Sequence, residues 1–235
     1  MSGSATVALA AATTFPAMAW AVRGRSSAIF GPSVWRAAPG RKAIALTFDD
    51  GPTPGTEAIL DILAQYRISS TFFQIGANVL SFPDIARAVA AAGHETGNHS
   101  HTHPNFALTR PTFIGAEFAR AQEAIHAVAG VQPRLLRAPF GVRWFGFRAM
   151  QRNLNLTGAM WSIIGRDWKL PADAIAQRVL SRVTEGDIIC LHDGRGTLKD
   201  SDIRPTIEAV RRIVPNLLEK GYHFETVSQL ICPTK

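Results

Sequence analysis

The stretch Ala43–Pro52 (AIALTFDDGP) sets the expectation for the whole fold. Its apolar first half predicts a buried strand. Two adjacent carboxylates, Asp49 and Asp50, stand where that strand ends, and Gly51-Pro52 then predicts a turn. An Asp-Asp pair before a turn can simply end a strand, but it can also present two acids with different roles to one pocket. The rest of the chain decides between these interpretations.

From residue 41 onward, short apolar segments alternate with amphipathic ones. Strands are predicted over residues 43–48, 70–75, 94–98, 135–137, 157–163, 187–192 and 223–226. Helices are predicted after Thr53-Pro54 and over residues 83–92, 111–129, 144–154, 171–183 and 204–220. Seven strands that alternate with helices indicate an α/β fold with parallel strands and crossover helices. No repeat or linker divides residues 41–235.

Composition limits the classes of protein and partner. The chain has 235 residues, of which 46% are hydrophobic and 18% charged, which is typical of a folded domain rather than a disordered chain. Its net charge of +7 favours an anionic surface, such as a phosphate-bearing envelope polymer or lipid headgroups. Nucleic acid is not expected as a partner, because the chain has no basic run with interleaved aromatic residues. The two cysteines, Cys190 and Cys232, do not indicate a disulfide framework.

The N-terminal region has a different character. Residues 5–22 are apolar or small and carry no charge, which is about the length that crosses a bilayer. Basic residues follow this stretch rather than precede it, so a membrane anchor, a cleaved signal and a misplaced start site are alternatives. We therefore expect residues 1–40 to be a leader and connector and residues 41–235 to be the functional domain. The expected location is the cell envelope, membrane-anchored or secreted.

Three histidines occupy alternate positions in Asn98–Pro104 (NHSHTHP). Neutral imidazole is a common metal ligand, and two histidines plus one carboxylate form a usual catalytic zinc set. On a strand, His99, His101 and His103 would share one face, whereas in a tight turn only His99 and His103 would face together. The cluster predicts metal binding.

Three further polar clusters follow predicted strands: Arg137–Gly141 (RAPFG), Arg166–Trp168 (RDW) and Leu191–Gly194 (LHDG). Each alone would suit an ordinary turn or a buried hydrogen-bonded side chain. In a parallel barrel, however, the carboxyl ends of the strands form one face, and the active site is built there. The five clusters therefore predict a single pocket.

These clusters resemble the motifs of the polysaccharide deacetylases with a NodB homology domain, carbohydrate esterase family 4. Thr47–Pro52 matches the first motif, T-F-D-D-G-P; His99-Ser100-x-x-His103 matches the second, H-[ST]-x-x-H; and Arg137-x-Pro139-Phe140-Gly141 matches the third. The resemblance covers about residues 41–235. It implies a distorted, incomplete (β/α)7-type barrel of parallel strands with its active site at their C-terminal ends.

The resemblance also implies a metal site. Asp50, His99 and His103 would hold a divalent metal, most commonly Zn²⁺, with Co²⁺, Ni²⁺ or Mn²⁺ as alternatives. His101 would not be a ligand.

The resemblance implies catalytic and substrate-binding residues as well. Asp49 would be the catalytic base and His192 the general acid. Arg137 would orient Asp49, and Asp167 would support Arg137. Three residues would contact the substrate: Phe140 through its backbone N–H, and Trp168 and Leu191 as walls of the acetyl pocket.

Two positions depart from the family pattern. Ile164 occupies the first position of the fourth motif, which is usually Asp, and Cys190 the first position of the fifth, which is usually Leu. We expect the support of Arg137 by Asp167 to survive and the acyl pocket to be reshaped rather than lost.

The implied activity is metal-dependent hydrolysis of N-acetyl groups on peptidoglycan or chitin-like N-acetylglucosamine chains, which releases acetate. One alternative is a deformylase or deacetylase of a lipid-linked amino sugar. Another is an inactive barrel that only binds envelope glycans, against which Asp49, His192 and the metal ligands count. The sequence leaves the sugar, the chain length and the oligomeric state open.

Overall fold

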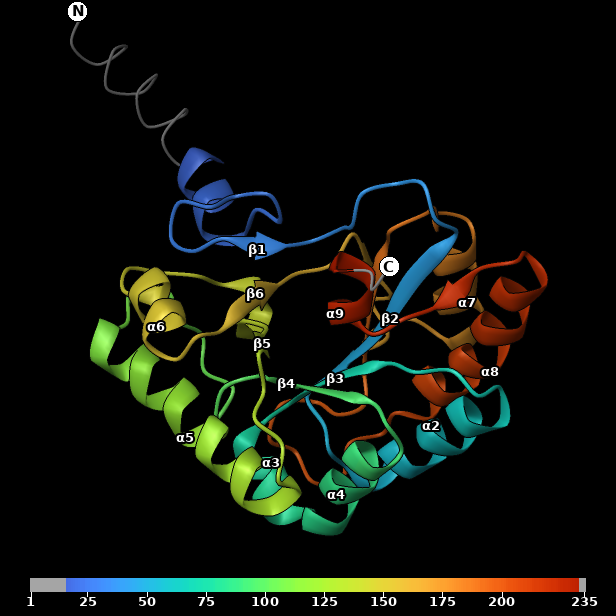
Figure 1. Ribbon diagram of the computed structural model, residues 1–235, viewed down its shortest axis with the longest axis horizontal. Helices are drawn as coiled ribbons and strands as arrows, with labels where there is room; N and C mark the ends of the chain where they lie inside the picture. Colours follow the sequence, from blue (N-terminus) through green and yellow to red (C-terminus); the bar gives the residue numbers. More distant parts are fainter. Residues whose placement is uncertain (1–15, 233–235) are drawn as a thin grey trace, which may run out of the picture.

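The computed structural model describes residues 16–232. Its strands form one parallel, curled sheet, and helices cover the outer side (Figure 1). The strands are β1 (Ser33–Val34), β2 (Ala43–Asp49), β3 (Thr71–Gln74), β4 (Glu95–Asn98), β5 (Leu135–Leu136), β6 (Thr157–Ala159), β7 (Ile163–Ile164), β8 (Ile188–His192) and β9 (His223–Phe224). They lie in the order β1-β6-β5-β4-β3-β2-β8-β7, and β9 pairs with the start of β2.

The helices follow the predicted alternation, with two additions. They are α2 (Pro54–Gln65), α3 (Gly76–Ser81), α4 (Pro83–Ala91), α5 (Pro111–Ala129), α6 (Phe147–Asn153), α7 (Ala172–Leu180), α8 (Arg204–Glu219) and α9 (Val227–Ile231). The predicted helix over residues 111–129 is confirmed to the residue as α5. The short helices α3 and α9 were not predicted.

Strand β2 lies at the centre of the sheet, and all seven of its residues are buried. Its side chains alternate between two faces, as they must on a strand. Ile44, Leu46 and Phe48 pack outward in the core cluster shared with α2, α7 and α8. The other face carries two alanines, then Thr47 and Asp49. The same alternation that builds the core therefore aims Asp49 into the barrel.

The predicted strand over residues 157–163 divides into two strands at opposite ends of the sheet. β6 pairs with β5 and β1, whereas β7 pairs with β8. Residues 160–162 cross between the two ends, and we call them the crossing segment. Its backbone is held by Met160 N, which donates to Val34 O at 2.6 Å, and by Ser162 N, which donates to Ile188 O at 3.0 Å. Within the described residues the end strands β1 and β7 do not pair with each other. The barrel is therefore incomplete, as the resemblance implied.

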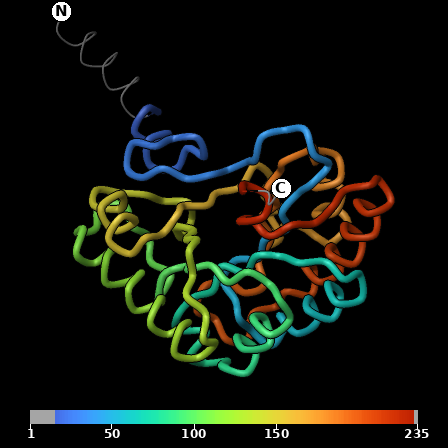
Figure 2. Tube along the Cα trace, in the orientation of Figure 1, coloured from blue at the N-terminus to red at the C-terminus, as the bar shows by residue number. Residues whose placement is uncertain are grey.

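Part of the expected connector belongs to the folded domain. β1 adds a strand beside β6, with Ser33 opposite Gly158. Ala21, Val22 and Phe30 are buried in the core cluster that contains residues of α5 and α6. Figure 2 shows this N-terminal trace running alongside the chain of α6 and β6. Only residues 16–22 of the predicted apolar stretch 5–22 are described; residues 1–15 lie outside the described part. No helix within residues 16–232 is long and apolar enough to cross a membrane.

Candidate active site

The carboxyl ends of the strands converge on a cavity of about 460 Å³. Seven of the ten predicted site residues line it: Asp49, Asp50, His99, His103, Phe140, Trp168 and His192. They come from segments far apart in the sequence, and the parallel sheet brings them together. A second cavity, of about 500 Å³ between β1, α6 and β6, contains none of these side chains.

Asp50, His99 and His103 meet at one point. Asp50 Oδ1 lies 3.1 Å from His103 Nε2 and 3.4 Å from His99 Nε2. The other ring nitrogen of His99 lies 2.8 Å from the carbonyl oxygen of Arg137. Because a carbonyl only accepts, that nitrogen carries the hydrogen, and Nε2 turns a lone pair toward the carboxylate. Two acceptors thus face each other, and no described donor bonds Asp50 Oδ1.

A bound cation would resolve this arrangement. Two imidazole nitrogens and one carboxylate oxygen are the donor set of many catalytic zinc sites. The residues present therefore fit a divalent metal. The imidazole of His101 lies apart from this set and packs against Gly76, where an added Cβ would come within 2.6 Å of its Nδ1.

The loop that carries the three histidines, residues 99–103, follows β4, and we call it the histidine loop. Bonds to α5 and α3 hold it in place. Glu117 is buried on α5, and its Oε2 accepts from the backbone N–H of His101 at 3.1 Å and of Thr102 at 2.7 Å. The first N–H groups of α3 donate to Ser100 O and His101 O, each at 3.0 Å. These bonds set the direction in which the loop presents its imidazoles.

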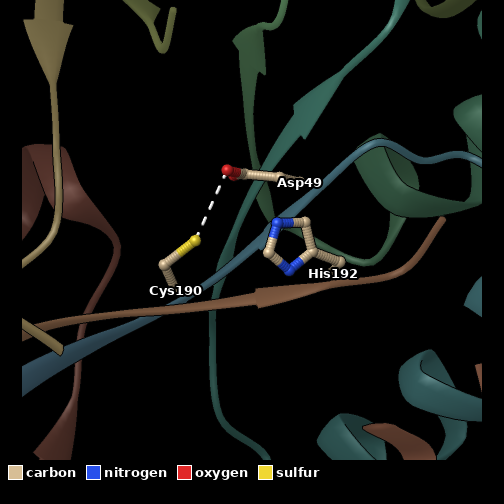
Figure 3. Close-up of side chains that lie close together, drawn as sticks. All are labelled: Asp49, Cys190 and His192. Carbon is tan, nitrogen blue, oxygen red and sulfur yellow. Dashed lines mark hydrogen bonds between the residues drawn. The ribbon is translucent and has the colours of Figure 1, made fainter. Parts of the chain in front are cut away.

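Asp49 is held by two donors. Arg137, which is fully buried, donates from Nη1 to Asp49 Oδ1 at 2.6 Å, as the resemblance implied. The thiol of Cys190 lies 3.4 Å from Asp49 Oδ2 (Figure 3). The remaining N–H groups of Arg137 donate to Ala159 O at 3.2 Å and Met160 O at 3.0 Å. Arg137 therefore ties the carboxylate to the edge of the crossing segment.

The predicted partner of Asp167 was wrong. Within the described chain no hydrogen bond joins Asp167 to Arg137. Instead Asp167 Oδ1 lies 2.9 Å from His192 Nδ1, and Oδ2 accepts from His192 N at 2.8 Å. The reason is that the loop after β7 runs beside β8, which brings Asp167 under the end of that strand. Asp167 thus orients His192 rather than Arg137.

His192 is basic in this setting. Burial alone would lower its pKa, but the negative charges of Asp167, Asp50 and Asp49 raise the pKa to about 9. Arg195 also lies near, with Nη1 at 3.8 Å from Asp167 Oδ2. The negative charges of the three carboxylates favour the protonated form of the imidazole. Its ring contacts Trp168 edge to face, with centroids 5.2 Å apart.

The placement of Leu191 in the pocket wall was also wrong. Leu191 is fully buried in the core cluster beneath α7 and α8 and does not line the cavity. On β8 it points away from the barrel, because its neighbours Cys190 and His192 point inward. Ile164 does line the cavity, together with Trp161. Burial and the charge of Asp49 raise the pKa of the Cys190 thiol well above its usual value, so Cys190 is a neutral donor.

Several residues of the site were missed from the sequence. Four residues line the cavity although the sequence analysis gave them no role: Arg23, Trp161, Arg195 and Gly196. Asp193 buttresses the opening turn, since its carboxylate accepts from Gly51 N at 3.0 Å and from Thr56 Oγ1 at 2.7 Å. The only signal for Asp193 was its place directly after His192; Arg23 and Trp161 gave none.

Comparisons with known proteins identify relatives of this chain. Residues 36–159 match the family model described as polysaccharide deacetylase. A chitooligosaccharide deacetylase of Sinorhizobium fredii is 36% identical over 205 residues, which is 84% of this chain and 95% of the relative.

Solved structures give the same grouping. The crystal structure of a peptidoglycan N-acetylglucosamine deacetylase superposes with a TM-score of 0.80 at 30% identity, over 86% of this chain and 93% of that one. A family 4 pseudoenzyme from Bacillus anthracis superposes with a TM-score of 0.77 at 26% identity, over 84% of this chain and 68% of that one. The chain therefore belongs to the polysaccharide deacetylase family, carbohydrate esterase family 4.

Proposed function

We propose that this protein hydrolyses N-acetyl groups on amino-sugar polymers or oligomers of the cell envelope and releases acetate. The observation that carries the proposal is the meeting of Asp50, His99 and His103 in one cavity, beside an Asp49 held by Arg137 and a His192 held by Asp167. Relatives named as chitooligosaccharide and peptidoglycan deacetylases support the substrate class.

The proposed resident metal is zinc, held by Asp50, His99 and His103. A bound divalent cation supplies Lewis acidity toward an amide carbonyl and toward a water molecule. Hydrogen bonds around the proposed ligands suit this role. The Nδ1–H of His99 donates to Arg137 O, and the Oδ2 atom of Asp50 accepts from Gly196 N at 2.9 Å. Such partners fix tautomer and ring orientation.

The remaining residues divide the proton transfers. Asp49, oriented by Arg137, accepts the proton of the attacking water as a general base. His192, kept cationic by Asp167, gives a proton to the departing amine nitrogen, without which the amine anion would be a very poor leaving group. The backbone N–H of Phe140, a residue with a φ of 56°, is proposed to donate to the developing oxyanion. Trp161, Ile164 and Trp168 supply apolar walls for the acetyl methyl group.

A structural neighbour that is a pseudoenzyme makes a direct activity test necessary. The test measures acetate release from N-acetylglucosamine oligomers and from whole peptidoglycan, with and without a chelator. Formate and acetate release from a lipid-linked amino sugar tests the alternative substrate class. An active wild-type protein that contains no metal would overturn the proposal, and so would glycan binding without any acetate release.

Two substitutions separate the adjacent acids. Asp50→Asn should lose metal and activity together, because it removes a ligand. Asp49→Asn should keep the metal and lose about 10²–10⁴-fold in kcat, as expected for a general base. Asp61→Asn, at an exposed position on the outer helix α2, is the matched control and should change neither.

A further inference from the structure

A smaller cavity adjoins the catalytic one. It measures about 340 Å³ and is lined by residues of the N-terminal segment: Trp20, Arg23, Gly24, Arg25, Ser26 and Trp35. Arg23 lines both cavities. Trp20, Arg23 and Trp35 belong to none of the family motifs, and all three precede the matched family region that begins at residue 36.

The N-terminal segment is fixed to the catalytic domain rather than loosely attached. Arg143, only 1% exposed, donates to Ser27 O at 2.7 Å, to Gly31 O at 3.1 Å and also to Gly24 O. A buried guanidinium is costly unless it is hydrogen-bonded, so these carbonyls and Arg143 hold one another in place. The side chain of Arg25 reaches the crossing segment and donates to Ser162 O. The cavity wall is therefore preformed.

The lining has the chemistry of a sugar site. Trp20 is 49% exposed, and its indole offers a flat apolar face with an N–H at one edge. Trp35 is partly exposed and forms the wall beside it, with the guanidinium of Arg36 6.0 Å from its ring centroid. The apolar C–H face of a pyranose ring stacks on such a surface. Gly24 lets the Trp20 ring lie close, since an added Cβ would come within 2.7 Å of the indole.

The charged side chains that line this cavity are all basic. Arg23 is exposed, and within residues 16–232 its side chain makes no hydrogen bond or ion pair. Arg25 lies over the Trp35 ring at 5.6 Å from its centroid. No Asp or Glu lines this cavity. A guanidinium whose side chain forms no ion pair favours a carboxylate ligand, which it can bind through two parallel hydrogen bonds.

We infer that Trp20, Arg23 and Trp35 form a second sugar subsite, which binds the unit next to the reacting N-acetyl sugar and prefers a unit that carries a carboxylate. The inference rests on the proposed deacetylation and specifies its substrate: a glycan in which N-acetylated and acidic sugars are neighbours. The subsite acts on specificity and not on the bond-breaking steps.

The test compares two oligomers of equal length. One is a neutral N-acetylglucosamine oligomer, and the other alternates N-acetylglucosamine with N-acetylmuramic acid. The wild-type protein should show a higher kcat/KM on the acidic oligomer. Arg23→Gln should lower the acidic-to-neutral ratio of kcat/KM about 10-fold, the effect expected when one charge-assisted hydrogen-bonded contact is lost. Arg23→Lys should retain part of the ratio, because it keeps the charge without the planar fork.

Two further variants sharpen the test. Trp20→Ala should raise KM for both oligomers with little change in kcat, because stacking binds ground state and transition state alike. Lys220→Gln removes the same charge from an exposed position after α8, near the amino-terminal end of β2, and should leave the ratio unchanged.

The outcomes separate the inference from the function beneath it. If the wild type releases no acetate from either oligomer, the proposed function fails. If it releases acetate and Arg23→Gln keeps the wild-type ratio, the subsite alone is overturned. An unchanged ratio together with weaker binding of Arg23→Gln to anionic lipid vesicles would assign the segment to a membrane surface and would also overturn the subsite.

Discussion

The thiol of Cys190 donates to Asp49 Oδ2 across 3.4 Å, while Arg137 holds Oδ1 of the same carboxylate at 2.6 Å. The family pattern has Leu where this chain has Cys190, so here the proposed base, Asp49, gains a second donor from the buried side chain of β8. A sulfur donor is weak, but it restrains the rotation of the carboxylate.

Replacement of this thiol should affect turnover and not metal content. Cys190→Ala should lower kcat up to about 5-fold, since a lost neutral hydrogen bond contributes about 1 kcal/mol. Cys190→Ser should stay closer to wild type because a hydroxyl is a better donor. The measurement is kcat beside metal analysis. Wild-type kcat in Cys190→Ala would show that the thiol only fills space.

The pairing of His192 with Asp167 predicts a pH dependence. Asp167, Asp50 and Asp49 raise the pKa of His192 to about 9, against the effect of burial, and Arg195 lies on the far side of Asp167. The general acid should therefore fail as the pH rises through about 9. In Asp167→Asn one of these negative charges is gone, so the alkaline limb of kcat should move to lower pH.

The raised pKa of His192 also makes the stability of the folded protein depend on pH. A histidine with a raised pKa contributes stability that is complete below its ordinary pKa of 6.5 and is lost as the pH rises through about 9. Urea unfolding of wild type and Asp167→Asn across that interval measures the contribution, which the variant should lose. An alkaline limb that stays in place in Asp167→Asn would contradict the assignment of His192 as the acid.

Arg137 cannot be replaced by lysine. Its guanidinium bonds Asp49, Thr47, Ala159 O and Met160 O, and one ammonium cannot reach all four. Arg137→Lys should lower the free energy of unfolding by about 1–3 kcal/mol, because it leaves buried acceptors without a donor, and it should abolish most turnover. Arg211→Lys, at an exposed position on α8, should change stability by less than about 0.5 kcal/mol. Equal urea midpoints for the two variants would refute this account.

Glu117 should control metal affinity from outside the ligand set. Glu117→Ala frees the N–H groups of His101 and Thr102, so the histidine loop loses its anchor on α5. A lost outer-layer partner typically lowers metal affinity about 10–100-fold. Titration against a competing chelator measures the change. Glu123→Ala, at an exposed position on the same helix, serves as control and should bind metal as wild type does.

The sequence predicted the catalytic face well because its signals are local. Polar residues that directly follow an apolar run mark three parts of this face in the sequence: the end of β2, the histidine loop and the end of β8. Helix α5 is bounded by Pro111 and by Gly130, whose φ of 68° ends it in the left-handed conformation.

What the sequence missed depends on distant contacts. Nothing in Met160-Trp161-Ser162 signals a break, since no Gly or Pro interrupts it; bonds from Arg137 and Arg25 turn the chain there. The partner of Asp167 depends on how a loop lies over β8. Leu191 is different: strict alternation from His192 would already have placed it outside the barrel.

The pairing of β1 with β6 also covers the backbone edge of β6. A shortened protein that starts at Arg36, where the family match begins, would lack β1 and expose the backbone edge of β6. It would also remove the carbonyl groups of Gly24, Ser27 and Gly31, to which Arg143 donates. Open strand edges pair with other chains, so we expect the shortened protein to elute as aggregates in size-exclusion chromatography. We therefore expect residues 16–35, which precede the matched family region, to protect this sheet edge from pairing with other chains.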